Sequence, residues 1–317
     1  MKHKNTLFVP LLTLVVSALL TLDTVLLDAI RDVGGGAFLS VSIVSFLILL
    51  VPMAFYCGLT RRSFARVASL KLPALRDVPF ALYVALAFLF GSATIKYLTC
   101  AFFTSASAVT GSLVSAPLYT ASNTPLVVLC FILLPAVLEQ ALFSGLVLTE
   151  YREYGDVICV LMSALMFAMA HGSFVNFAFY LFGGLCMALV TRITASILPA
   201  ALIAALSAAL DLYYESLFFE YVTLPGTGSI LFYFFCGLFL LFSVLAVSHL
   251  EKSYARRARS VKESALVALE EARREQESER KEEKSRLSFG AKLRLCFLSP
   301  VFILLIALFV IRASGVL

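Results

Sequence analysis

Two ionisable side chains, Glu139 and His171, stand inside apolar stretches of this 317-residue sequence. A charged side chain at the centre of a membrane costs about 3 kcal/mol, so such residues indicate function by default. If the two stretches form adjacent antiparallel helices, Glu139 and His171 can lie at the same depth. A buried carboxylate can take a proton from water while an imidazole orients that water. The pair therefore predicts the acid–base half of a peptide hydrolase.

Zinc-dependent hydrolysis is disfavoured by the number of available ligands. Catalytic zinc takes three protein ligands, but His3 and His249 lie near the N-terminus and at the end of an apolar stretch. The seven cysteines form no C-x-x-C pair, which is typical of small buried hydrophobic residues. We therefore predict neither a metal site nor a cofactor.

The residues around the pair form a pattern that resembles a known family. The pattern is Glu139-Gln140-x-x-Phe143-Ser144-Gly145, then Phe167-x-x-x-His171, then Gly183-Gly184, and finally Ser196-Ile-Leu-Pro. It resembles the CPBP family, which contains CAAX prenyl proteases and bacteriocin-processing or immunity-type membrane proteins, over about residues 125–212. The resemblance implies that Glu139 and His171 activate water. It also implies a later H-x-x-x-N motif that stabilises the oxyanion.

This sequence departs from the family pattern at four positions. In this sequence Gln140 stands where the family motif E-E-x-x-F-R-G has its second Glu, and Ser144 stands where the motif has Arg. Ala204 and Ala208 stand where the family has the late His and Asn. Loss of one oxyanion donor typically costs about 10²–10³ in rate. The polar residues that could support the site or replace these donors are Gln140, Ser144, Ser207, Tyr180 and Asn176.

The composition indicates a membrane protein. The chain is 61% hydrophobic and 14% charged, with a mean hydropathy of +0.96, whereas soluble domains are nearer half apolar and a quarter charged. Recurring apolar runs predict an all-α polytopic bundle of eight or nine spans. The expected spans are 7–27, 37–59, 78–98, 125–149, 157–172, 177–191, 196–212, 229–249 and 296–311.

The expected organisation has five parts. They are N-terminal transmembrane helices (1–123), a CAAX-protease-like core (124–212), a further transmembrane helix (213–250), a charged insert (251–294) and a C-terminal transmembrane helix (295–317). Residues 100–124 and 213–228 contain the expected external loops. The core glycines Gly183 and Gly184 are expected to serve close helix packing.

The positive charges predict the orientation. Five Lys or Arg lie between residues 61 and 76, and residues 251–294 hold 13 of the 25 in the chain. The positive-inside rule then places the N-terminus and residues 251–294 in the cytoplasm, and we expect the plasma membrane of a bacterium. Lys96, Asp23, Asp211 and Arg192 lie nearer the ends of spans, where placement at the interface, or snorkelling for Lys96, is expected.

Three hypotheses for function remain. The first is an intramembrane endopeptidase acting on membrane-associated or hydrophobic peptide tails, with Glu139 as general base. The second is a non-catalytic scaffold, immunity or regulatory protein, in which Glu139 and His171 only fix helix register. A transporter is the third, although no inverted repeat is visible. The expected partners are membrane lipids and a hydrophobic peptide or protein, and not nucleic acid, because the positive charge belongs to cytoplasmic loops.

Overall fold

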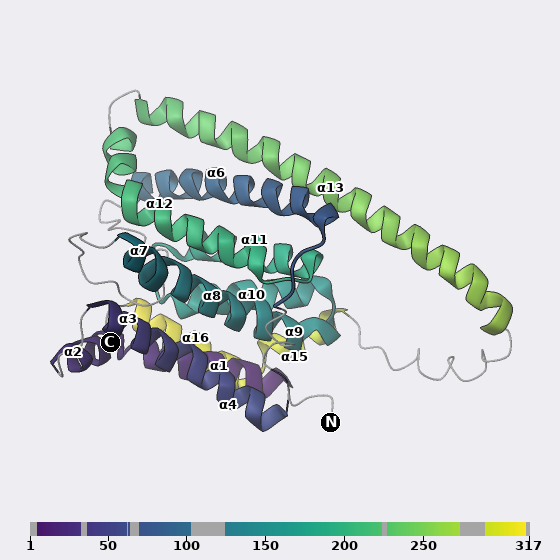
Figure 1. Cartoon of the computed structure of the whole chain (residues 1–317), viewed down its shortest axis with the longest axis horizontal. Helices are drawn as coiled ribbons and strands as arrows, with labels where there is room; N and C mark the ends of the chain where they lie inside the picture. Colours follow the sequence, from purple (N-terminus) through teal and green to yellow (C-terminus); the bar gives the residue numbers. More distant parts are fainter. Residues whose placement is uncertain are drawn as a thin grey trace.

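The computed structural model describes residues 5–32, 37–61, 63, 70–102, 124–223, 227–272 and 289–314. Every regular element in these residues is a helix (Figure 1), which confirms the all-α prediction. Within the described residues, five helices are long and apolar enough to cross a membrane: Phe38–Thr60, Leu75–Phe102, Pro125–Tyr154, Phe177–Thr194 and Gly228–Lys252. The protein is therefore an integral membrane helical bundle.

The number of spans stays a prediction. The pair α15 (Phe289–Phe297) and α16 (Pro300–Ala313) adds a sixth candidate span, bent by 56° at a break before Pro300. The proline carries no N–H and cannot continue the preceding helix. Three further apolar helices are shorter than the five: Leu7–Leu20, Asp156–Ala170 and Leu198–Tyr213.

The first predicted span is two helices and not one. Helix α1 (Asn5–Leu20) ends in a turn, where the N–H of Thr21 and its hydroxyl both donate to the carbonyl of Ala18. Helix α2 (Asp23–Asp32) then starts with Asp23 in its first turn, where an acidic residue is favourable. The break lies directly before Asp23, the charged residue of the predicted span.

The span that carries Glu139 is a helix with two wide turns. It runs through α7 (Thr124–Val127), the π-helix η3 (Val128–Leu133), α8 (Leu134–Gln140), the π-helix η4 (Ala141–Val147), α9 (Leu148–Glu150) and the 3₁₀ turn η5 (Tyr151–Tyr154). The ring of Pro135 would collide with the carbonyl four residues earlier, and that carbonyl belongs to Phe131 in η3. The wide turn accommodates this clash. The candidate span Phe38–Thr60 repeats the arrangement with α3 (Ala37–Ser45), the π-helix η1 (Phe46–Leu50) and α4 (Val51–Thr60). Pro52 lies four residues after Ile48 in η1.

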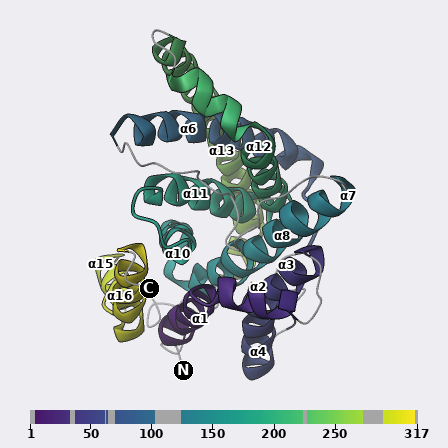
Figure 2. The same cartoon turned by 90° about the vertical axis from the view of Figure 1, so that its left-hand side faces the viewer.

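The remaining helices surround this span in layers. Helices α10 (Asp156–Ala170) and α11 (Phe177–Thr194) pack on each other, α11 packs on α6 (Val78–Phe102) and α12 (Leu198–Thr223), and α12 packs on α8. Helix α13 (Thr227–Ala272) lies along α6 on one side, while α1 and α16 lie together on the opposite side (Figures 1 and 2).

One glycine sets the spacing of α10 and α11. A Cβ atom at Gly184 would lie 2.8 Å from Cα of Ala164, a backbone atom that cannot move alone. Gly184 thus serves the close helix packing that the sequence predicts.

Two expected boundaries are crossed by continuous helix. The predicted external loop 213–228 is wrong as a loop, because α12 continues to Thr223 and α13 begins at Thr227. Helix α13 also runs through His249 into the charged segment as far as Ala272, and it extends past the bundle in Figure 1. Residues 273–288 of the predicted charged insert lie outside the described part, as does most of the predicted loop 100–124. The division into five parts stays a prediction.

Candidate active site

Glu139 lies in a buried cavity between the two π-helical turns of its span. Its side chain belongs to α8, with η3 before it and η4 after it, and only 2% of its surface is exposed. The cavity volume is about 10 Å³, which is just enough for one water molecule. The residues that line this cavity, called the Glu139 cavity below, are Phe88, Glu139, Phe167, Phe179, Tyr180, Gly183, Met187, Ala204 and Ser207.

His171 ends helix α10 beside the wall of the Glu139 cavity. Its Nδ1 lies 2.8 Å from the carbonyl oxygen of Phe167, and because a carbonyl only accepts, Nδ1 carries the proton and Nε2 is an acceptor. Nε2 is buried without a hydrogen-bond partner among the described residues. The imidazole stacks on the ring of Tyr180, with centroids 3.8 Å apart, and meets Phe167 at 4.5 Å. Since Phe167 and Tyr180 also line the Glu139 cavity, Glu139 and His171 border the same two aromatic rings.

Gln140 and Ser144 form a closed polar pair outside the cavity lining. The Ser144 hydroxyl donates to Oε1 of Gln140 at 2.6 Å, and Nε2 of Gln140 donates to the sulfur of Met187 at 2.9 Å. Both side chains are buried. The charged pair that the family motif has at these two positions is therefore replaced by a neutral hydrogen bond across one helical turn. Met187 lines the Glu139 cavity, so Gln140 holds part of its wall.

The predicted donors and the two alanines divide into those at the cavity and those away from it. Ala204, Ser207 and Tyr180 line the Glu139 cavity, so a methyl group stands where the family places its late His. Ala208 packs against the hydrophobic core instead. Asn176 precedes α11, where its backbone N–H donates to Ser173 and its Oδ1 has no partner among the described residues. The structure thus brings Ser207 and Tyr180 to Glu139, and does not bring Asn176.

Arg312, a residue that sequence reasoning did not select, reaches the end of α10 from α16. Its Nη1 donates to the carbonyl of Ala170 at 2.6 Å. The side chain crosses Gly172, where a Cβ atom would lie 2.8 Å from Cδ of Arg312. Gly172 has a φ of +64°, a conformation that also favours glycine. Arg312 interacts electrostatically with Asp23 and Tyr180, so a cation lies close to His171.

Lys96 and Asp211 form a buried ion pair between two helices. Lys96 of α6 forms an ion pair with Asp211 of α12, and their side chains are only 9% and 11% exposed. The ammonium group of Lys96 also lies 5.0 Å from the ring centroid of Phe179, which lines the Glu139 cavity. The ammonium group of Lys96 is thus buried against Asp211 and does not extend to solvent as snorkelling would require, whereas the placement of Asp211 near the membrane interface stays a prediction. Each residue compensates the other's charge.

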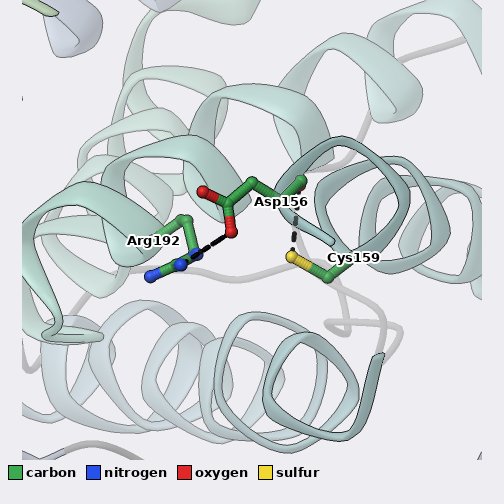
Figure 3. Close-up of polar contacts among 3 residues, drawn as sticks. All are labelled: Asp156, Cys159 and Arg192. Carbon is green, nitrogen blue, oxygen red and sulfur yellow. Dashed lines mark hydrogen bonds and ion pairs between the residues drawn. The ribbon is translucent and has the colours of Figure 1, made fainter. Parts of the chain in front are cut away.

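Arg192 lies at a helix end, as expected, and has a specific partner there. Its Nε and Nη2 donate to Oδ1 of Asp156 at 2.9 and 2.6 Å, and the thiol of Cys159 donates to the carbonyl of Asp156 (Figure 3). Asp156 begins α10 and Arg192 lies in the last turn of α11. The ion pair therefore joins the two helices at the end opposite His171 and Tyr180.

Potential metal ligands do not gather in the described part of the chain. No group of three or more His, Cys, Asp or Glu residues lies close enough there to hold a metal ion. The groups at or beside the Glu139 cavity that can take part in chemistry include a carboxylate, an imidazole and hydroxyl groups.

Comparison with known proteins places the site within a family pattern. The search of curated proteins gives no match, and the search of solved structures gives none either. A comparison with family patterns does give a match, and it covers residues 120–210. This segment contains Glu139, His171, Ala204 and Ser207 and excludes Lys96, Asp211 and Arg312. Residues 120–210 match the family described as type II CAAX prenyl endopeptidase Rce1-like, and this confirms the resemblance that the motifs predict.

Proposed function

We propose that this protein is a CPBP-type intramembrane endopeptidase that cleaves membrane-associated or hydrophobic peptide tails. The observation that carries the proposal is the buried Glu139 in a cavity of one water's size, with the hydroxyl-bearing Ser207 in the same lining. A carboxylate removed from bulk solvent is a stronger base towards a water held against it. The match of residues 120–210 supports the same reaction class.

The residues divide the reaction between them. Glu139 takes a proton from the water, whose oxygen attacks the peptide carbonyl, and then returns the proton to the leaving amine. The proposal assigns His171 the orientation of the water through Nε2, because its Nδ1 proton is held by the Phe167 carbonyl; His171 contacts Phe167 and Tyr180 and does not itself line the cavity. Ser207 donates to the developing oxyanion.

The geometry predicts a slow enzyme. The methyl groups of Ala204 and Ala208 donate nothing, so Ser207 supplies one donor where the family pattern has two. One missing donor corresponds to about 10²–10³ in rate.

The proposal is tested by cleavage of membrane-tethered peptides by the full-length protein in lipid nanodiscs. Glu139→Gln keeps the shape of the side chain and removes the base, so it is the matched control. We expect wild-type cleavage and none by Glu139→Gln. Equal cleavage by both proteins would exclude Glu139 as the base.

A catalytically impaired scaffold is the second candidate function. The apolar wall of the Glu139 cavity, with Met187, Ala204 and four aromatic rings, favours it. The double variant Ala204→His with Ala208→Asn separates the two candidates. Cleavage that appears only in this variant identifies an impaired protease, whereas cleavage by the wild-type protein identifies a working one.

We also propose that the N-terminus and residues 251–294 face the cytoplasm of a bacterium. The support is the charge pattern together with the continuity of α13, which carries the candidate span Gly228–Lys252 straight into the charged segment. Single cysteines introduced into a cysteine-free variant, labelled in intact and in permeabilised cells, test the orientation. Labelling of residue 260 in intact cells would contradict it.

A further inference from the structure

A second and larger cavity adjoins the Glu139 cavity. Its volume is about 240 Å³, and Phe88 and Ser207 line both cavities. The lining comes from α6, α12 and α13, and it is apolar except for Ser92, Lys96, Ser207 and Asp211. Helices α6 and α13 lie outside the segment that matches the family. We refer to this space as the lateral cavity.

The lateral cavity contains a complete pair of opposite charges. Lys96 and Asp211 line it and bond to each other. Oδ2 of Asp211 is buried and has no hydrogen-bond partner among the described residues. A buried ion pair costs desolvation, and an unpaired carboxylate oxygen adds to that cost. The wall of the cavity therefore contains a carboxylate, with one oxygen that lacks a hydrogen-bond partner among the described residues, and an ammonium group beside an apolar space.

The polar and apolar groups together indicate the kind of ligand. A peptide backbone presents an N–H that can donate to Asp211 and a carbonyl that can accept from Lys96, while an apolar side chain fills the rest of the space. An acyl or isoprenoid chain presents neither polar group and would leave the Asp211 oxygen unpaired. The chemistry of the lining thus fits a peptide better than a lipid chain.

We infer that the lateral cavity is the substrate-recognition pocket, which takes a large apolar side chain of the peptide while Lys96 and Asp211 bond to its backbone. This inference rests on the proposed function, because it places the scissile bond beside Ser207, where the two cavities meet. Specificity then comes from α6, α12 and α13, and residues 203–210 of the α12 part of the lateral cavity belong to the family segment.

The test measures binding in a protein that cannot turn over. Full-length Glu139→Gln protein in nanodiscs is exposed to a membrane-tethered hydrophobic peptide that carries one photoreactive phenylalanine. A photoreactive fatty acid serves as the lipid probe. We expect the peptide to crosslink to α6 or α13 residues of the lateral cavity, identified by mass spectrometry. Crosslinking of the cavity by the fatty acid but not by the peptide would overturn the inference.

Two variants make the result specific. Ala93→Phe fills the lateral cavity and should lower peptide crosslinking by about tenfold, which corresponds to the loss of one buried apolar side chain. Leu82→Phe, on the exposed face of the same helix, is the matched control and should leave crosslinking unchanged. Equal crosslinking by both variants would assign the peptide to another site.

The ion pair is tested by replacing both partners. Lys96→Met with Asp211→Leu removes both charges and avoids leaving one buried alone. This variant should retain the melting temperature of the parent and lose peptide crosslinking. Retained crosslinking would show that the ion pair takes no part in recognition.

Failure of the pocket and failure of the protease give different results. If wild-type protein cleaves and the same cleavage persists in Ala93→Phe, the protease stands and the pocket does not. If the pocket binds the peptide but wild-type protein cleaves nothing, the pocket stands as the binding site of a scaffold.

Discussion

Ser144 donates a hydrogen bond of 2.6 Å to Gln140 one helical turn earlier, and this pair occupies the positions of a charged pair in the family motif. The family motif has a Glu and an Arg at these positions, so the exchange removes two charges and leaves a neutral bond across one helical turn. Because Gln140 also bonds to Met187, the neutral pair connects η4 and α8 to the wall of the Glu139 cavity on α11. The loss of the two charges of the family motif is thus compensated by a neutral hydrogen bond between Ser144 and Gln140.

Removal of the Ser144 hydroxyl should destabilise the protein. In Ser144→Ala, Oε1 of Gln140 stays buried without this donor, which costs about 1–3 kcal/mol. The double variant Gln140→Met with Ser144→Ala removes both polar partners and should cost less than the single change. Melting temperatures of the purified variants in one detergent measure the order. A double variant less stable than Ser144→Ala would contradict the compensated pair.

Loss of the Ser207 hydroxyl should slow cleavage without unfolding the protein. Ser207→Ala removes the proposed oxyanion donor and should lower kcat by about 10²–10³, with KM nearly unchanged. Ser42→Ala is the matched control, because the Ser42 hydroxyl bonds only within α3, to Phe38. The kinetics use a peptide that the wild-type protein cleaves. A purely higher KM in Ser207→Ala would assign Ser207 to binding and not to the transition state.

Arg312 should stabilise the neighbourhood of His171. Arg312→Met takes the donor from the Ala170 carbonyl and leaves Asp23 without this cation, so we expect a loss of about 1–3 kcal/mol. Asp23→Asn added to Arg312→Met should recover part of it, because the buried charge is then gone.

The control for Arg312 is Arg152→Met. The Arg152 side chain is exposed, and changes at such positions stay within about 0.5 kcal/mol. Thermal unfolding compares the two variants, and equal melting temperatures would remove the assigned role of Arg312.

A methyl group at Gly184 should separate α10 from α11. Gly184→Ala places a Cβ atom 2.8 Å from Cα of Ala164, and overpacking of this kind costs about 1–3 kcal/mol. Gly237→Ala in α13 is the matched control, since no atom lies within 4 Å of the added Cβ. The control should be neutral or slightly stabilising, because alanine has the higher helix propensity. Similar melting temperatures for both variants would show that the α10–α11 spacing is adjustable.

Part of the site was predictable because its members are close in the sequence or follow a recognisable spacing. Glu139 and Phe143 lie one turn apart in the helical span Pro125–Tyr154, and Phe167 and His171 lie at the same spacing along α10. The structure adds that Phe143 and Phe167 meet edge to face at 5.5 Å. The roles of Glu139 and His171 as base and water-orienting group stay predictions.

The sequence by itself determined the class of the protein, because hydrophobic runs and one-turn spacings are local properties that a single helix already expresses. It predicted a helical membrane bundle, a family motif around Glu139 and His171, and close packing at Gly184. Local pattern carries no information on which distant charge will face a buried one. Only the tertiary structure decided that Lys96 meets Asp211, 115 residues away, and that Arg312 reaches Ala170, 142 residues away. Residues this far apart in the sequence meet only when the helices pack against one another. A buried charge without its partner would be strongly destabilising, so the packing must supply that partner.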